Sequence, residues 1–247
     1  MQLTVLGCFG PFPGAGGACS GYLLKEDGCN LLIDCGNGVF SRLQEHLDYR
    51  EIDAVMLSHL HPDHISDLMV MRYALAFAEE TTLRNKPLPV YALPEPEAEF
   101  ERLPYQDVYE VNPLQEEKAF KIGPFTIETV FGVHSVPSLA MRFHSQSGIF
   151  VYSGDTEYHP VLEEFAAGAD LFLCEANFRD IDIEEGFSNH LSASQAAQIA
   201  SEAKVKRLLL THHYPENDQT ANLAEAEKHY PEAELAREGE SYEIKTL

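Results

Sequence analysis

Short apolar runs separated by polar turns dominate the first half of the chain. The runs that read as strands are residues 2–7, 21–26, 30–36 and 54–58. The second and third of these strands are joined at Asp27-Gly28, a pair typical of a tight hairpin turn. Apolar residues at helical spacing predict helices at 39–48 and after Pro62. A glycine-rich loop beginning at Gly10 separates the first two strands.

The second half starts with strands and then alternates between helices and strands. The predicted strands are residues 125–133, 139–145, 149–155, 169–176, 207–212 and 241–245, and the predicted helices lie near 158–166, 192–203 and 218–229. This order predicts an α/β (α+β) fold in which two sheets pack face to face with helices outside. The sequence has no low-complexity linker and no repeat at a fixed period. We therefore expect residues 1–247 to form a single domain, with two similar halves meeting at a central cleft.

The net charge of the chain limits the kinds of molecule that it is expected to bind. The 247 residues include 40 acidic and 17 basic side chains, for a formal net charge of −23. The longest basic cluster is only Lys204, Lys206 and Arg207, which leads into a predicted strand. An acidic surface without a basic patch repels nucleic acid and anionic membranes. We expect a small-molecule substrate, no nucleic-acid partner and no membrane association.

Cysteine usage and the N-terminal segment predict a cytoplasmic protein. The five cysteines lack CxxC spacing and lie in apolar or glycine-rich runs, as free buried thiols do in a reducing compartment. The opening residues, MQLTVLGCFG, lack the positive start and long apolar stretch of a signal peptide. No apolar run approaches the 18 or so residues that a membrane span needs.

The densest chemistry is in SHLHPDH, residues 58–64. Residues two apart in an extended segment share a face, so His59 and His61 can hold one ion together. The proline suits the first turn of a helix, which turns Asp63 and His64 back towards the strand end as a second pair. The alternative is a polar loop with incidental histidines. Four metal-binding side chains in six positions favour a metal site instead.

Further candidate ligands follow other predicted strands. His134 follows an apolar strand, Asp155 directly follows the next one, and His212 and His213 follow a late strand. Each alone is compatible with a capped turn or a surface residue, but together with residues 58–64 they favour ligands. The sequence does not distinguish His212 from His213. The remaining histidines lack this placement and are expected at the surface or behind the ligands: His46, His144, His159 and His229.

His190 lies just before a helix that Ser192 is expected to cap. Another ligand there would be redundant, whereas a proton donor or a stabiliser of developing negative charge at the rim of the site would not. The alternative is a solvent-facing loop histidine. We take His190 and Asp63 as the candidate catalytic residues.

These motifs resemble the metallo-β-lactamase superfamily almost from end to end. The resemblance rests on HLHPDH, on Asp155 in SGDT, on a histidine after a late strand and on the early IDCGNG. His134-Ser-x-Pro-Ser and the placement of His190 are similar to the ribonuclease Z-like branch. The size and the opening are also similar to small bacterial hydrolases of the YhfI type. The His-Thr-Pro-Gly-His motif typical of the thioester and lactone hydrolases of the superfamily is absent.

The resemblance implies a four-layer αββα sandwich with the site at one edge of its sheets. His59, His61 and His134 would hold one divalent ion, and Asp63, His64 and His212 a second, with Asp155 bridging them. Zinc is the expected metal, with manganese or iron as alternatives. Asp34 would fix the ligand loop from behind. Related proteins also suggest a homodimer.

The implied activity is hydrolysis of a small or cyclic phosphodiester by a metal-bridged hydroxide, with His190 acting on the leaving oxygen. A carboxylic ester, thioester or lactone hydrolase on the same site is the first alternative. A tRNA 3′-processing endonuclease is the second. In ribonuclease Z a basic arm grips tRNA, but here residues 94–118 are acidic, with Arg102 and Lys118 their only basic residues. A metal-binding protein without turnover is a fourth interpretation, opposed by the complete ligand set.

Overall fold

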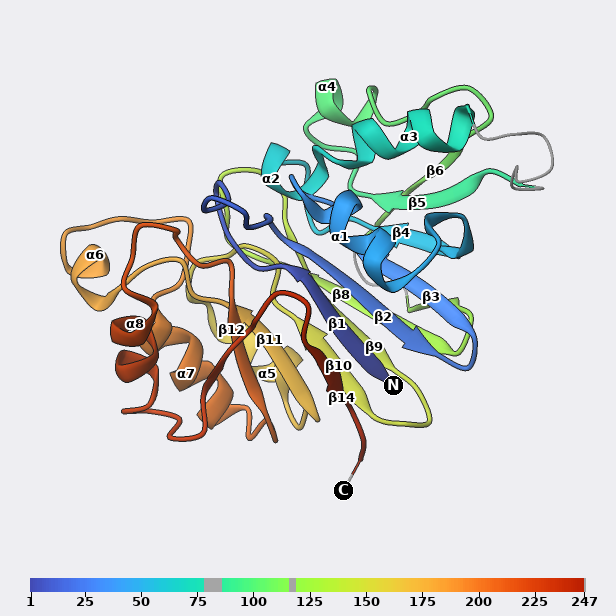
Figure 1. Ribbon diagram of the computed structural model, residues 1–247. Coiled ribbons are helices and arrows are strands. Elements are labelled where there is room, and N and C mark those ends of the chain that lie inside the picture. Colours follow the sequence, from blue (N-terminus) through green and yellow to red (C-terminus); the bar gives the residue numbers. More distant parts are fainter. Residues whose placement is uncertain (78–85, 116–118, 247) are drawn as a thin grey trace.

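The computed structural model describes residues 1–77, 86–115 and 119–246. Two seven-stranded mixed sheets face each other (Figure 1). The first sheet, in spatial order, contains β14 (Ser241–Glu243), β1 (Gln2–Gly7), β2 (Gly21–Glu26), β3 (Cys29–Ile33), β4 (Ala54–Met56), β5 (Leu88–Ala92) and β6 (Tyr109–Pro113). The second contains β13 (Glu234–Leu235), β12 (Leu208–Thr211), β11 (Leu171–Glu175), β10 (Ile149–Tyr152), β9 (Leu139–His144), β8 (Phe125–Phe131) and β7 (Phe120–Ile122).

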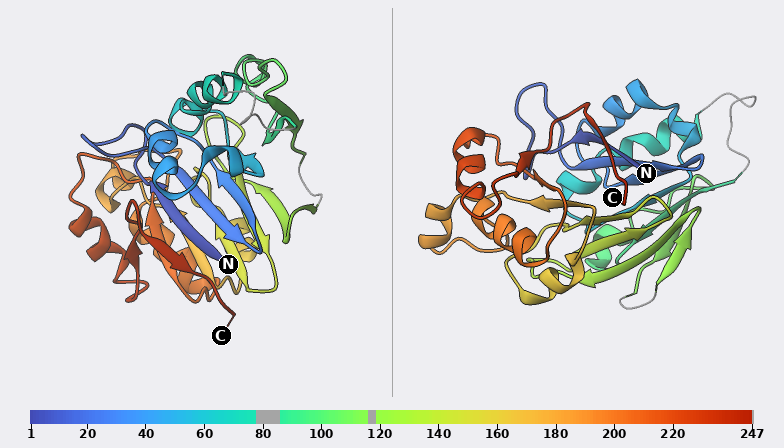
Figure 2. Two further views of the ribbon diagram at one scale, coloured as in Figure 1. Left: turned by 45° about the vertical axis from the view of Figure 1, so that its right-hand side comes forward. Right: turned by 90° about the horizontal axis from the view of Figure 1, so that it is seen from below.

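Helices cover the outer faces of both sheets (Figures 1 and 2). Beside the first sheet are α1 (Val39–His46), the 3-10 helix η1 (Tyr49–Glu51), α2 (Pro62–Ile65), α3 (Leu68–Ala76) and α4 (Glu97–Phe100). Beside the second are α5 (Pro160–Ala166), α6 (Asp180–Glu184), α7 (Ala193–Glu202) and α8 (Gln219–Ala226). The predicted αββα sandwich is confirmed.

Successive side chains along each strand alternate between the core between the sheets and the outer face under the helices. In β3, Leu31 and Ile33 face the core between the sheets, whereas Leu32 faces the helices. The largest buried rings of the central core include Phe125, Phe143 and Phe150. Since successive strand residues point to opposite faces, a strand covered on both sides reads as a nearly continuous apolar run.

The hairpin turn forms where it is predicted. Asp27 and Gly28 both have positive φ, at 47° and 79°. This pair of left-handed residues is what a two-residue hairpin between right-twisted strands requires. The hairpin fixes β3, which leads to the IDCG turn behind the ligand loop.

The helix predicted after Pro62 is divided in two. The break lies at Ser66 and Asp67, where the backbone bonds to the IDCG turn instead of continuing the helix. Asp67 N donates to Cys35 O at 3.0 Å, and Cys35 N donates to His64 O at 2.7 Å. These contacts hold the ligand loop against the end of β3.

The sequence prediction misses β5, β6 and the short strands β7 and β13, and it does not foresee the pairing of β14. Strands β5 and β6 contain Pro89 and Pro113, and β6 also lies in the acidic segment, so neither gives a clear strand signal. Proline is tolerated in β6 because this strand is at the sheet edge. Strand β14 pairs with β1, so the two sheets do not correspond to two halves of the chain, and the termini lie close together (Figure 2). Within the described ranges no helix is long and apolar enough to cross a membrane.

Candidate metal centre

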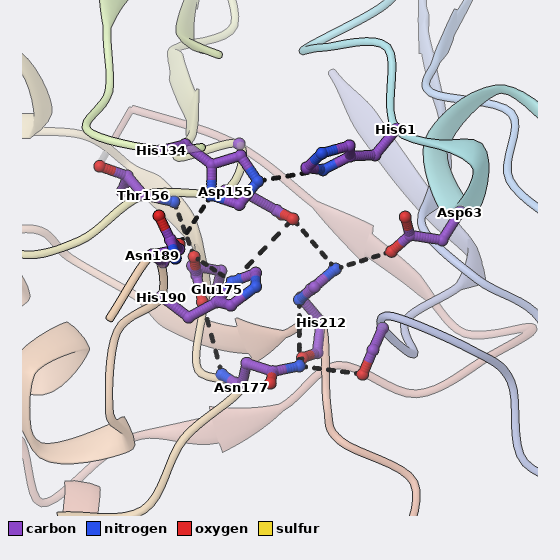
Figure 3. Close-up of polar contacts among 12 residues, drawn as sticks. His61, Asp63, His134, Asp155, Thr156, Glu175, Asn177, Asn189, His190 and His212 are labelled. Carbon is purple, nitrogen blue, oxygen red and sulfur yellow. Dashed lines mark hydrogen bonds and ion pairs between the residues drawn. The ribbon is translucent and has the colours of Figure 1, made fainter. Parts of the chain in front are cut away.

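The seven predicted ligands converge at one edge of the sheets. Strands β10, β11 and β12 are parallel, so their carboxyl ends meet at this edge, and the ligand loop after β4 faces them from the first sheet (Figures 1 and 3). The ligand atoms form two groups, each within 4.8 Å: His59, His61 and His134 in one, and Asp63, His64, Asp155 and His212 in the other. Segments far apart in the sequence thus form a single site.

The first group consists of three imidazole nitrogens that face one another. His61 Nδ1 lies 3.1 Å from His59 Nε2 and 3.1 Å from His134 Nε2. His134 Nδ1 donates to the carbonyl of Asn189 at 2.7 Å. In the neutral ring Nε2 therefore carries no proton, and its lone pair is available to a metal ion. Nitrogens at about 2.1 Å from a tetrahedral zinc ion lie about 3.4 Å apart. The three nitrogens therefore surround a position of the right size for one cation.

The second group combines two carboxylates with two imidazoles. His212 Nε2 lies 3.2 Å from Asp63 Oδ2 and 3.2 Å from Asp155 Oδ2. His64 Nε2 lies 3.3 Å from Asp155 Oδ2 and 3.6 Å from Asp63 Oδ2. This mixture of nitrogen and oxygen donors suits zinc, manganese or iron.

Asp155 lies between the two groups. Its Oδ2, already part of the second group, is 3.7 Å from His59 Nε2 of the first. Asp155 Oδ1 and His64 Nε2 are buried and have no hydrogen-bond partner within the described part of the chain. Because buried polar atoms are nearly always paired, these atoms fit the role of cation ligands. The donor set fits divalent cations, and Asp155 Oδ2 lies close to donors of both groups.

The electrostatics of the two groups differ. Burial, reinforced by His64, holds the pKa of His59 well below its usual range, and burial also lowers the pKa of His61 and His134. These rings are therefore neutral, as metal ligands must be. Burial opposes ionisation of Asp155, but His212 and His64 outweigh it and hold the pKa of Asp155 well below its usual range. The neighbouring carboxylates also outweigh burial and raise the pKa of His64 well above its usual range, and a bound cation would take the place of this proton.

Asp34 anchors the ligand loop from behind. Its Oδ1 accepts a hydrogen bond from Ser58 N at 2.7 Å, and its Oδ2 accepts from Ser58 Oγ at 2.8 Å and from Tyr152 OH at 2.9 Å. His64 Nδ1 also donates to Asp34 Oδ2, at 2.8 Å. Ser58 Oγ lies 3.0 Å from His59 Nδ1. Both rings are thereby oriented with Nε2 towards the site, the role expected for Asp34.

His212, rather than His213, faces the site. Asn177, which the sequence did not single out, donates through Nδ2 to the carbonyls of Gly10 and His212, both at 2.9 Å. A Cβ on Gly10 would lie 1.9 Å from His212 Nε2, so glycine is needed where the loop covers this ring. His213 is buried on the other side, with its ring edge against Phe9. The loop that follows Gly10 forms one wall of the site.

His190 lies at the rim and is held by a buried carboxylate. Its Nδ1 donates to Glu175 Oε1 at 3.0 Å (Figure 3). Glu175 is fully buried and also accepts from the backbone nitrogens of Thr156 and Leu191, at 2.7 and 3.2 Å. Burial lowers the pKa of His190, but Glu175 outweighs it and raises the pKa to about 9. The sequence prediction missed Glu175, whose signal was its position at the end of a strand.

A cavity of about 410 Å³ opens beside the ligand atoms. Both candidate catalytic residues, Asp63 and His190, line it. The other lining residues are Pro11, His61, Pro62, His134, Ser135, Asp155, Ser188, Asn189 and His212. This cavity fits a small ligand with polar groups.

The remaining predicted features lie outside the site. His46, His144, His159 and His229 belong to none of the ligand groups formed by the described residues. Arg102, a basic residue of the acidic segment, forms an ion pair with Glu99 at 2.6 Å. The end of that segment, Glu116, Glu117 and Lys118, lies outside the described residues. All five cysteines are buried and unpaired, as predicted.

Known proteins are similar to this chain in sequence and in fold. Residues 29–213 match the family described as Beta-lactamase superfamily domain. The probable metallo-hydrolase YhfI of Bacillus subtilis is 35% identical over 212 residues, which cover 86% of each chain. Its crystal structure superposes with a TM-score of 0.91 at 33% identity, over 98% of this chain and 99% of that one. A ribonuclease Z of Mycolicibacterium gilvum is 28% identical over 87% of this chain and 85% of its own.

Proposed function

The chain belongs to the β-lactamase superfamily as a metallo-hydrolase, and from this we propose that it hydrolyses a small or cyclic phosphodiester at a centre of two divalent cations. The observation that carries the proposal is the position of Asp155 Oδ2, within 3.7 Å of His59 Nε2 and 3.2 Å of His212 Nε2. A single carboxylate oxygen shared by two ligand groups is the arrangement that a bridged pair of ions requires. Zinc is the proposed metal.

Two bound cations supply Lewis-acid stabilisation of phosphoryl oxygens and an activated water. The protein's own groups complete the site. His190 lies beside the cavity with Nδ1 bound to Glu175, so Nε2 is available to protonate the leaving oxygen. Asp63 lines the same cavity and is placed to accept a proton from the attacking water. A phosphodiester suits this site because it spreads its charge over two oxygens.

Resemblance to ribonuclease Z makes tRNA processing the competing proposal. The acidic segment opposes it, because its glutamates would repel a phosphate backbone. Those described are Glu95, Glu97, Glu99, Glu101 and Glu110. Hydrolysis of a carboxylic ester, thioester or lactone would use the same ligands, but the sequence lacks the His-Thr-Pro-Gly-His motif typical of the hydrolases that act on thioesters and lactones.

A substrate screen with zinc-loaded protein tests the proposal. The panel contains bis(p-nitrophenyl) phosphate, cyclic nucleotides, a dinucleotide, a lactone and a thioester. We expect turnover of phosphodiesters, abolished by a chelator and restored by zinc. Turnover of the lactone or thioester alone would replace the proposal with the carboxylic-ester alternative.

A further inference from the structure

Two buried tyrosines cross between the sheets behind the metal centre. Tyr22 lies on β2 of the first sheet and Tyr152 on β10 of the second, and they are 0% and 1% exposed. Their rings meet edge to face, with centroids 5.1 Å apart. Tyr22 OH lies 2.7 Å from Thr211 Oγ1 of the second sheet. Tyr152 OH donates to Asp34 Oδ2, after β3 of the first sheet, at 2.9 Å. The pair therefore links the two sheets in both directions.

The partners of these tyrosines adjoin ligands of the second group. Asp34 Oδ2 also accepts from His64 Nδ1 at 2.8 Å, and Thr211 directly precedes His212. Asp34 and His212 both have left-handed backbones, with φ of 56° and 54°. Such a conformation is uncommon outside glycine and persists where surrounding contacts hold it. The tyrosine hydroxyls supply contacts of this kind at both places.

The second ligand group is itself divided between the sheets. His64 comes from the loop after β4 of the first sheet, whereas Asp155 and His212 follow β10 and β12 of the second. The two halves approach through His64 Nε2 and Asp155 Oδ2, which lie 3.3 Å apart. This separation depends on the spacing of the sheets at the edge that holds the site. Tyr22 and Tyr152 are buried contacts across that spacing.

The first ligand group is less directly connected to the pair. His59 is linked to Tyr152 through two residues, Ser58 and Asp34. Tyr22 instead contacts the residue that precedes a ligand of the second group. A loss of either hydroxyl should therefore affect the second group more than the first.

We propose that Tyr22 and Tyr152 are positioning residues that set the separation between the two halves of the second ligand group, and thereby the affinity for the second cation. The inference rests on the proposed centre of two cations. Neither tyrosine is among the described residues that line the cavity, so each acts through its hydrogen-bonded partner. Because a phenylalanine ring fills nearly the same space, the hydroxyls contribute the bonds between the sheets and not the packing.

Substitution by phenylalanine tests this, because it removes each hydroxyl and keeps the ring. The variants are Tyr22→Phe and Tyr152→Phe. Tyr242→Phe is the matched control, because Tyr242 is buried in the same core and its hydroxyl bonds to Glu240 on the β14 side. Zinc is titrated into the metal-free proteins in competition with a chromophoric chelator, which gives a dissociation constant for each ion. Thermal unfolding of the metal-free proteins measures effects on the fold alone.

Residues behind metal ligands contribute about 10–100-fold to metal affinity. We expect each tyrosine variant to raise one zinc dissociation constant about tenfold and to leave the other unchanged, with kcat restored by excess zinc. In an Asp63→Ala background, which lacks a ligand of the second group alone, neither change should alter the remaining constant. The Tyr242→Phe control should alter neither constant.

Two results would overturn the inference and leave the proposed centre standing. One is a pair of unchanged constants in both tyrosine variants, because the hydroxyls would then stabilise the fold alone. The other is equal weakening of both ions, because the effect would then not belong to the second ligand group. A wild-type protein that binds a single zinc ion would refute the proposed centre of two cations, and the inference with it.

Discussion

The carboxylate of Glu175 lies 3.0 Å from Nδ1 of His190, at the rim of the cavity. Glu175 leaves the end of β11, whereas His190 comes from the loop before α7. The contact orients the ring and stabilises its charged form. A buried acid thereby turns a loop histidine into a candidate proton donor with a defined direction.

Glu175→Gln should weaken this donor without removing it. Glu175 raises the pKa of His190 from 6.5 to about 9, so the wild-type ring keeps its proton at neutral pH and loses it as the pH rises through about 9. Removing the negative charge should move the basic limb of the kcat profile to lower pH and reduce kcat about 10–100-fold. Kinetics across pH check this, with exposed Glu164→Gln as control. An unshifted limb would mean that Glu175 has only a packing role.

His190→Ala should separate proton donation from electrostatic stabilisation. His190 is not one of the seven proposed ligands, so both metals should remain bound. For a poor leaving group kcat should fall by about 10²–10⁴-fold. With an activated aryl diester the loss should shrink if the role is proton donation, and persist if the role is electrostatic. Unchanged rates on both substrates would mean that His190 is a surface residue without a role in catalysis. A loss of metal equal to the loss of activity would mean that His190 is a metal ligand.

Asp155→Ala should lower metal occupancy and activity together. The carboxylate contacts both ligand groups, so we expect a loss of activity beyond the roughly 10–100-fold typical of residues behind the ligands. Circular dichroism should show the fold retained. His144→Ala, at an exposed histidine outside the site, is the control. If the variant kept both its metal content and its rate, Asp155 would have only a structural role in the turn.

Long RNA should bind weakly. The net charge of −23 and the acidic segment oppose contact with a phosphate backbone. In a fluorescence anisotropy titration at moderate salt, tRNA should not saturate at about 10 µM protein. Tight, salt-sensitive binding would reveal a basic surface and revive the tRNA-processing alternative.

The convergence of the candidate ligands is predictable from the sequence because each of them lies at the end of a recognisable strand. His134, Asp155 and His212 follow apolar runs, and residues 59–64 follow another. Parallel strands bring such ends to one edge of a sheet, so position along the strand translates directly into position in space. The order of the sheet and helix layers is also predictable, because strand alternation and helical spacing are local features of the sequence.

What the sequence does not predict depends on distant partners. Glu175 reads as one more polar strand end, since its partners lie at Thr156 and His190. Asn177 acts on His212 across 35 positions. The pairing of β14 with β1 joins the two ends of the chain. Spacing and periodicity carry no information about such contacts.

Metal stoichiometry tests the central claim most directly. Elemental analysis of gently purified protein, combined with an activity titration in which zinc is added back after chelation, gives the number of ions that activity requires. Two ligand groups joined by Asp155 predict up to two divalent ions per chain as isolated, and full activity only when both are bound. A fully active protein with one ion per chain, unaffected by added metal, would contradict the account.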